Sequence, residues 1–125
     1  MTNKSENGVK LEDLKDSIDA QVLCGQDLLS VEISSVSASD MMSDALTFAK
    51  EGSMMVTGLI NRQVVRTAEM AGVAAICFVR GKRPEEETIT LAKEKNITLL
   101  ATKLSMFEAC GRLYKKGLHG GDKTK

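Results

Sequence analysis

Aromatic side chains are scarce in this chain of 125 residues, which has three phenylalanines, one tyrosine and no tryptophan. Single-stranded nucleic acid is bound by stacking bases on aromatic rings, so this scarcity argues against such a surface. Lysine plus arginine number 17, as do aspartate plus glutamate, and the formal net charge is zero. Nucleic-acid binders carry a basic surplus. We therefore expect no nucleic-acid partner, and no net charge opposes self-association.

Histidine and cysteine are also too few for a metal centre or an activated nucleophile. The chain has one histidine, His119, and three cysteines, Cys24, Cys77 and Cys110, none of them paired at metal-ligand spacing. A nucleophile needs a base within reach, and the histidine lies in the Gly-rich tail. The sequence therefore predicts no metal, no cofactor and no enzyme activity.

Long apolar runs are missing too. No run approaches the roughly 18 residues that span a bilayer, and no secretory signal is visible at the N-terminus. We therefore expect a cytoplasmic protein without a membrane partner, whose cysteines are reduced and act as small buried hydrophobes.

What the chain does have is three short apolar runs, each followed by a helix-patterned stretch. The runs are Met54–Gly58, Val73–Val79 and Ile97–Thr102. This alternation is typical of β-α units that build a parallel sheet, and Val73–Val79 has the continuous apolar character of a central strand. The sequence predicts one α/β domain, a three-layer sandwich around a mostly parallel sheet.

Shorter elements are expected before the first run. Apolar spacing predicts a helix over Leu11–Ile18 and strands over Ala20–Cys24 and Val31–Ile33. We also expect a small N-terminal β element. The serines of residues 34–39 interrupt the alternation and predict a bulge or an irregular edge. The domain is expected to span residues 10–118, with a disordered N-terminus (1–9) and a flexible tail (119–125).

Boundary residues mark the ends of the longer helices. Asp40 or Ser39 is expected to cap a helix that ends at Gly52, and Asn61 caps a helix that ends at Gly72. Pro84 is expected in the first turn of the next helix.

The last helix begins with a capping box. Ser105 and Glu108 have the spacing of that motif. We expect this helix to turn Phe107, Cys110 (or Gly111) and Tyr114 toward the core.

The loops that follow the three strands are the place where a ligand is expected, because open parallel sheets bind ligands at the carboxyl ends of their strands. They combine basic side chains, glycines and helix N-termini, which suits a nucleotide or another phosphorylated anion. The alternative is that they are ordinary turns with solvated charges. The candidate ligand residues are Thr57, Gly58, Asn61, Arg62, Arg80, Gly81, Lys82, Arg83, Thr102, Lys103 and Ser105.

Methionine supplies a candidate interface. Met41, Met42, Met54 and Met55 gather around one predicted helix–strand junction, and methionine is an adaptable residue at contact surfaces. We predict a homodimer through this surface; the alternative is that all four belong to the core, which we favour for two of them.

Four stretches carry a resemblance to a known family. Residues 39–44, 60–62, 80–84 and 100–108 together resemble the DRTGG domain, over roughly residues 10–118. The name-giving motif has changed: Asn61 and Arg62 stand for its Asp-Arg pair, and residues 79–81 for its Thr-Gly-Gly triplet.

The resemblance implies a fold like the N-terminal domain of HPr kinase/phosphorylase. It also implies a role like that of the regulatory modules in phosphotransacetylases and CBS-domain pyrophosphatases, which are not catalytic and tend to dimerise. The leading hypothesis is therefore a non-catalytic regulatory or assembly module that acts as a homodimer. The alternatives are a small-ligand sensor, and an accessory subunit of a larger anaerobic redox enzyme complex.

Overall fold

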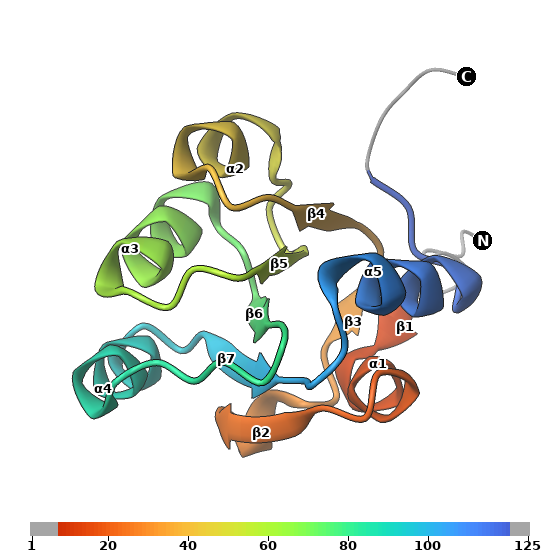
Figure 1. Ribbon diagram of the computed structural model, residues 1–125, viewed down its shortest axis with the longest axis horizontal. Helices are drawn as coiled ribbons and strands as arrows, with labels where there is room; N and C mark the ends of the chain where they lie inside the picture. The colour runs from red at the N-terminus through yellow and green to blue at the C-terminus, as the bar shows by residue number, and fades with distance from the viewer. Residues whose placement is uncertain (1–7, 121–125) are drawn as a thin grey trace.

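A computed structural model describes residues 8–120 (Figure 1). The strands are β1 (Val9–Lys10), β2 (Gln21–Cys24), β3 (Glu32–Ile33), β4 (Val36–Ala38), β5 (Met54–Thr57), β6 (Ala75–Phe78) and β7 (Thr98–Ala101). The helices are α1 (Leu11–Ser17), α2 (Met42–Phe48), α3 (Arg62–Ala71), α4 (Glu86–Glu94) and α5 (Met106–Lys115), with a 3-10 turn over Gln26–Leu28.

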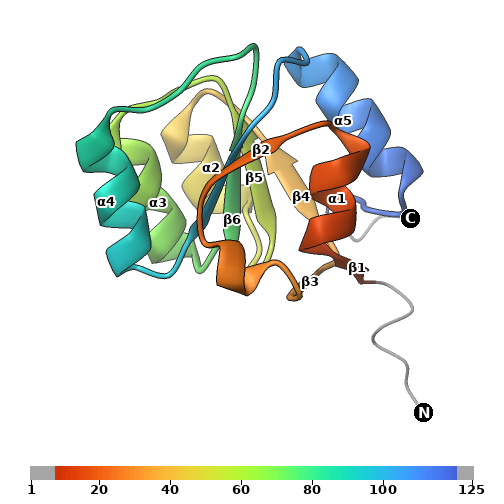
Figure 2. The same ribbon diagram turned by 90° about the horizontal axis from the view of Figure 1, so that it is seen from below.

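The main sheet has five strands in the order β2-β7-β6-β5-β4. Strands β4 to β7 are parallel, whereas β2 is antiparallel to β7 at one edge. Helices α2, α3 and α4 cover one face, and α1 and α5 cover the other (Figures 1 and 2). A separate two-stranded sheet pairs β1 with β3. The predicted α/β class, mostly parallel sheet and small N-terminal β element are confirmed.

The core lies on both faces of the sheet, and every residue of β5, β6 and β7 is buried. In β6, Ala75 and Cys77 pack with α1 and α5, whereas Ile76 and Phe78 pack with the helices of the other face. This two-sided burial explains why β6 reads as a continuous apolar run. It also fixes the strand ends that carry the loops described below.

The serine-rich stretch lies at an edge of the main sheet, but it is more regular than predicted. Residues 36–38 form a regular parallel strand, β4, in which Val36 lies opposite Met54. An edge strand needs only backbone hydrogen bonds on one side, so polar side chains do not prevent it.

Helix α2 is shorter than predicted: its last residue is Phe48, whereas the prediction placed its end at Gly52. Its N-cap residue is Met41, where the described side chains provide no capping hydrogen bond. Ser39 Oγ instead accepts from the Met41 amide at 2.9 Å, which makes a turn before the helix. Asp40 bonds elsewhere, as shown below.

Helix α4 begins at Glu86, so Pro84 precedes the helix rather than opening it. Helix α3 has its predicted ends, from the N-cap position at Asn61 to Gly72, which closes it in the left-handed region at φ +73°. The Asn61 side chain, however, makes no capping hydrogen bond among the described residues. Ser105 caps α5 by accepting from the Glu108 amide at 3.2 Å.

The prediction for the inner face of α5 is wrong for the two aromatic residues. Phe107 is 86% exposed and Tyr114 is 73% exposed, whereas Ala109 and Leu113 are buried against the sheet. Cys110 is half-buried beside them. The small and aliphatic side chains therefore set the packed stripe, since they let the helix approach the sheet closely.

Two of the four methionines predicted at an interface lie in the core. Met54 and Met55 are fully buried in β5, so the prediction that they form a surface is wrong. Met41 is 59% exposed, and Met42 is half-buried.

Both ends of the described chain take part in strand pairing. Val9 pairs with Ile33, and the Val36 amide donates to the carbonyl of His119 at 2.9 Å. The predicted disordered N-terminus and flexible tail otherwise fall on residues 1–7 and 121–125, which lie outside the described residues. No helix within residues 8–120 has the length and apolar character to cross a bilayer.

The thiol of Cys77 makes stability depend on pH. Burial raises the pKa of this thiol to about 12, with a smaller contribution from Cys110. Above pH 9 the unfolded chain therefore loses a proton that the native chain keeps, and the free energy of unfolding falls. We expect Cys77 to contribute a decline of up to about 1.4 kcal/mol per pH unit.

Urea unfolding on both sides of that pH, for the native chain and for Cys77→Ala, measures this decline. The variant should lose the Cys77 contribution to the slope, whatever stability it loses to the smaller side chain. Equal slopes in the two proteins would contradict the assignment.

Candidate functional site

The carboxyl ends of β5, β6 and β7 lie at one edge of the sheet, where Thr57, Phe78 and Ala101 are in register. Two of the loops that follow are tied together. The Arg80 amide donates to Leu104 O and the Gly81 amide donates to Thr102 O, both at 2.8 Å. Arg80 and Gly81 adopt left-handed φ angles of +62° and +72° to make these bonds. The β6–α4 and β7–α5 loops therefore form a single platform.

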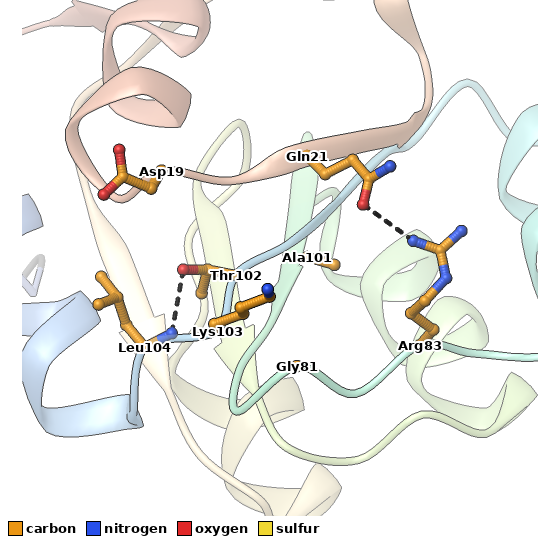
Figure 3. A pocket seen from close by; sticks show the side chains of 8 residues that line it. All are labelled: Asp19, Gln21, Gly81, Arg83, Ala101, Thr102, Lys103 and Leu104. Carbon is orange, nitrogen blue, oxygen red and sulfur yellow. Dashed lines mark hydrogen bonds between the residues drawn. The ribbon is translucent and has the colours of Figure 1, made fainter.

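A pocket of about 420 Å³ opens on this platform (Figure 3). It is lined by Asp19, Gln21, Gly81, Arg83, Ala101, Thr102, Lys103 and Leu104. Thr102 fixes its base, because its hydroxyl donates to Ile18 O at 2.6 Å and accepts from the Leu104 amide at 3.2 Å. The volume lies within the range of small-molecule sites.

Two cationic side chains line this pocket, and they differ in their hydrogen bonding. Arg83 Nη1 donates to Gln21 Oε1 at 3.1 Å, so its guanidinium is held against β2. The Lys103 ammonium lies between the two sides of the pocket (Figure 3) and has no hydrogen-bond or ion-pair partner among residues 8–120. Both side chains are exposed, and two cations that line one pocket favour an anion there.

Asp19 is the one carboxylate that lines the pocket. It stands at the rim with a left-handed φ of +51°, and its carboxylate lies 3.5 Å from Arg112 Nη1. Its side chain is 81% exposed, so solvent screens its charge. Because Arg83 and Lys103 are exposed too, the positive balance rests on number: two cations and one carboxylate line the pocket.

Polar groups at the start of the β5–α3 loop form hydrogen bonds with other residues of the protein. Asp40 Oδ1 accepts from the Gly58 amide at 2.7 Å and from the Thr57 hydroxyl at 3.2 Å. Lys82 Nζ donates to Gly58 O at 3.3 Å, and these residues with Arg80 line a space of only about 80 Å³. Thus Thr57, Gly58, Arg80 and Lys82 do not reach the larger pocket.

The remaining predicted residues lie elsewhere. Asn61 and Arg62 line a smaller pocket of about 230 Å³ with Glu85 and Glu87, whose carboxylates disfavour an anion there. Ser105 is committed to capping α5. Of the predicted set, Gly81, Arg83, Thr102 and Lys103 come together in the larger pocket.

The sequence reasoning missed the contribution of the N-terminal segment. Gln21 and Asp19 come from β2 and the turn before it, which pack against β7. No motif marks either residue. The sequence predicted a strand over Ala20–Cys24, but it did not predict that this strand lies beside the last strand of the sheet.

The matched family defines the class of protein. The DRTGG domain model matches residues 13–115, most of the chain, so this protein belongs to the DRTGG domain family.

Within residues 8–120 there is no group of three or more side chains suited to a metal ion.

A solved structure is similar over most of the chain. It contains the CBS and DRTGG domains of the regulatory region of Clostridium perfringens pyrophosphatase, in complex with the activator diadenosine tetraphosphate. The TM-score is 0.70 at 23% identity, and the match covers 87% of this chain and 47% of that one. This chain therefore spans about half of that structure's length, and the likeness shows a shared fold. No curated protein matches the chain.

Proposed function

We propose that this protein is a non-catalytic regulatory module whose strand-end pocket binds a nucleotide or another small phosphorylated molecule. The observation that carries the proposal is the Lys103 ammonium, which lies without a described partner in a pocket of about 420 Å³. The similar pyrophosphatase region has a nucleotide activator, which agrees with a regulatory role.

Each part of the pocket suits part of such a ligand. Lys103 and Arg83 supply charged donors for phosphate oxygens, and the planar guanidinium can bind two oxygens at once. Gly81 has no side chain, so a ligand can approach its backbone. Ala101 and Leu104 offer apolar surface to the rest of the molecule.

Thermal unfolding against a panel of ligands tests this proposal. The panel contains AMP, ADP, ATP, diadenosine tetraphosphate, coenzyme A, acetyl phosphate and inorganic phosphate. A ligand at about 100 times its dissociation constant stabilises the native state by about 2.7 kcal/mol, which raises the melting temperature by several degrees. The double variant Arg83→Ala/Lys103→Ala should lose this shift.

The matched control removes two cations from outside the pocket. Arg62→Ala/Arg66→Ala makes the same change in net charge on α3, where both side chains are exposed. This control should keep the shift. A shift lost in the control and kept in the pocket variant would place the site elsewhere, and no shift with any compound would contradict ligand binding.

We also propose that the module acts as a homodimer. Large apolar side chains stand exposed on α2 and α5, among them Phe48 at 65% and Phe107 at 86%. Exposed apolar surface is typical of contact sites, and the zero net charge does not oppose association. Sedimentation of a monomer at concentrations in the tens of micromolar would contradict the dimer.

A further inference from the structure

The outer face of α5 carries apolar side chains that the fold does not use. Phe107 and Tyr114 are 86% and 73% exposed, and Gly111 lies between them on the same side of the helix. Three of the four aromatic side chains of the chain are exposed, and two of these share this face. Covering large apolar side chains removes apolar surface from water, which favours association.

Gly111 is the second observation. Glycine in the middle of a helix is destabilising relative to alanine. Apart from its chain neighbours and the backbone of its own helix, no described atom lies within 4 Å of the position that a Cβ of this residue would occupy. Packing within residues 8–120 therefore does not require glycine. Its φ is not in the left-handed region, so the backbone does not require it either. A glycine between two exposed rings leaves a notch into which another backbone can come close.

We infer that the α5 helices of two copies pack antiparallel in the homodimer, with Gly111 at the closest approach. This inference rests on the homodimer part of the proposed function. Phe107 and Tyr114 lie at equal distances from the midpoint of this face, between Cys110 and Gly111. A two-fold axis there sets Phe107 of each copy against the second copy's Tyr114, as an isologous contact requires.

The charges along the same side of α5 support the antiparallel arrangement. Glu108, whose carboxylate lies 3.3 Å from Arg112 Nε of the same helix, stands near its beginning, and Lys115 stands near its end. Antiparallel packing brings Glu108 of one copy near the second copy's Lys115, whereas parallel packing brings like charges together. Because α5 is only ten residues long, the helix pair is a small interface, and we expect a dimer of micromolar affinity.

Sedimentation equilibrium of surface variants tests the inference. The native chain should be dimeric at about 100 µM, in keeping with a small interface. Phe107→Glu and Gly111→Leu should each raise the dissociation constant at least about tenfold, which is about 1.4 kcal/mol. Gly111→Leu adds apolar surface and helix propensity. If it still weakens the dimer, the cause is that the two helices no longer approach closely, and not a loss of apolar area. The control Met70→Glu, on a residue 65% exposed in α3, should remain dimeric.

A rescue experiment tests the orientation. In the antiparallel pair, the double variant Phe107→Glu/Tyr114→Lys sets opposite charges against each other and should dimerise more tightly than Phe107→Glu alone. Thermal unfolding of every variant checks that it is folded.

The outcomes separate the claims. A native chain that is monomeric overturns the dimer together with this interface, and leaves the ligand pocket to its own test. A dimer that survives Phe107→Glu and Gly111→Leu but dissociates with Met41→Glu overturns the α5 interface and keeps the homodimer.

Discussion

Gly25→Ala is expected to lower the free energy of unfolding by about 3 kcal/mol, from backbone strain and overpacking together. Gly25 follows β2 with φ +87°, a conformation that an L-residue adopts only with strain. A Cβ there would lie 2.5 Å from Thr98 Oγ1 and 2.8 Å from Thr98 Cα. Thr98 is fully buried in β7, so its backbone cannot move aside without disturbing the sheet. Urea unfolding measures the loss.

Gly52→Ala is the matched control. Gly52 also has a positive φ, +77°, but no described atom lies within 4 Å of its Cβ position. This variant should lose only the cost of the left-handed conformation, about 1–2 kcal/mol. Equal losses in the two variants would show that the contact between Gly25 and Thr98 does not constrain β2, which carries one wall of the pocket.

Asp40→Ala is expected to cost about 1–2 kcal/mol of stability, because it leaves the buried Thr57 hydroxyl without its acceptor. At the exposed Gly58 amide, water can take the place of the carboxylate. Asp40 accepts hydrogen bonds from the Gly58 amide and from the hydroxyl of Thr57, a residue that is fully buried. It therefore ties the β4–α2 connection to the β5–α3 loop. Urea unfolding of Asp40→Ala and Asp40→Asn measures this, and the asparagine variant, which keeps an acceptor oxygen, should lose less.

Asp44→Ala serves as the control for charge. Asp44 is an exposed carboxylate in the first turn of α2, so its removal should change stability by less than about 1 kcal/mol. A loss as large as that of Asp40→Ala would mean that negative charge near α2, rather than the two hydrogen bonds, carries the effect.

The central strands and the helix ends were predictable because their signals are local. Strand β6 is buried on both faces and reads as an uninterrupted apolar run, and Gly72 ends α3 where a left-handed residue is required. Ser105 carries its capping partner three residues away. Each of these features depends on residues that lie close together in the chain.

The features that the sequence did not predict depend on contacts between distant segments. The position of β2 beside β7 is set by pairing across the sheet, and no residue type in Gln21–Cys24 encodes that neighbour. The inner face of α5 was assigned to aromatic residues on hydrophobicity alone, whereas Ala109 and Leu113 make the contact.

The candidate site shows the same division. The loops that carry Arg83 and Lys103 were predicted, because ligand sites follow the strands of a parallel sheet. Which loop residues converge was not predictable. Asp40, 18 residues before Gly58 in the chain, bonds to its amide, and Arg62 lies beside the carboxylates of the next helix.

The most direct test of the strand-end pocket is an amide chemical-shift titration of the ¹⁵N-labelled chain with ADP, and with inorganic phosphate in parallel. The account predicts saturable shifts at Gly81, Thr102, Lys103 and Leu104, the residues that line the pocket. The chemical shifts of the Asn61 and Arg62 amides should not change. Shifts centred on Asn61 and Arg62, or no saturable shift at the pocket residues with either compound, would contradict it.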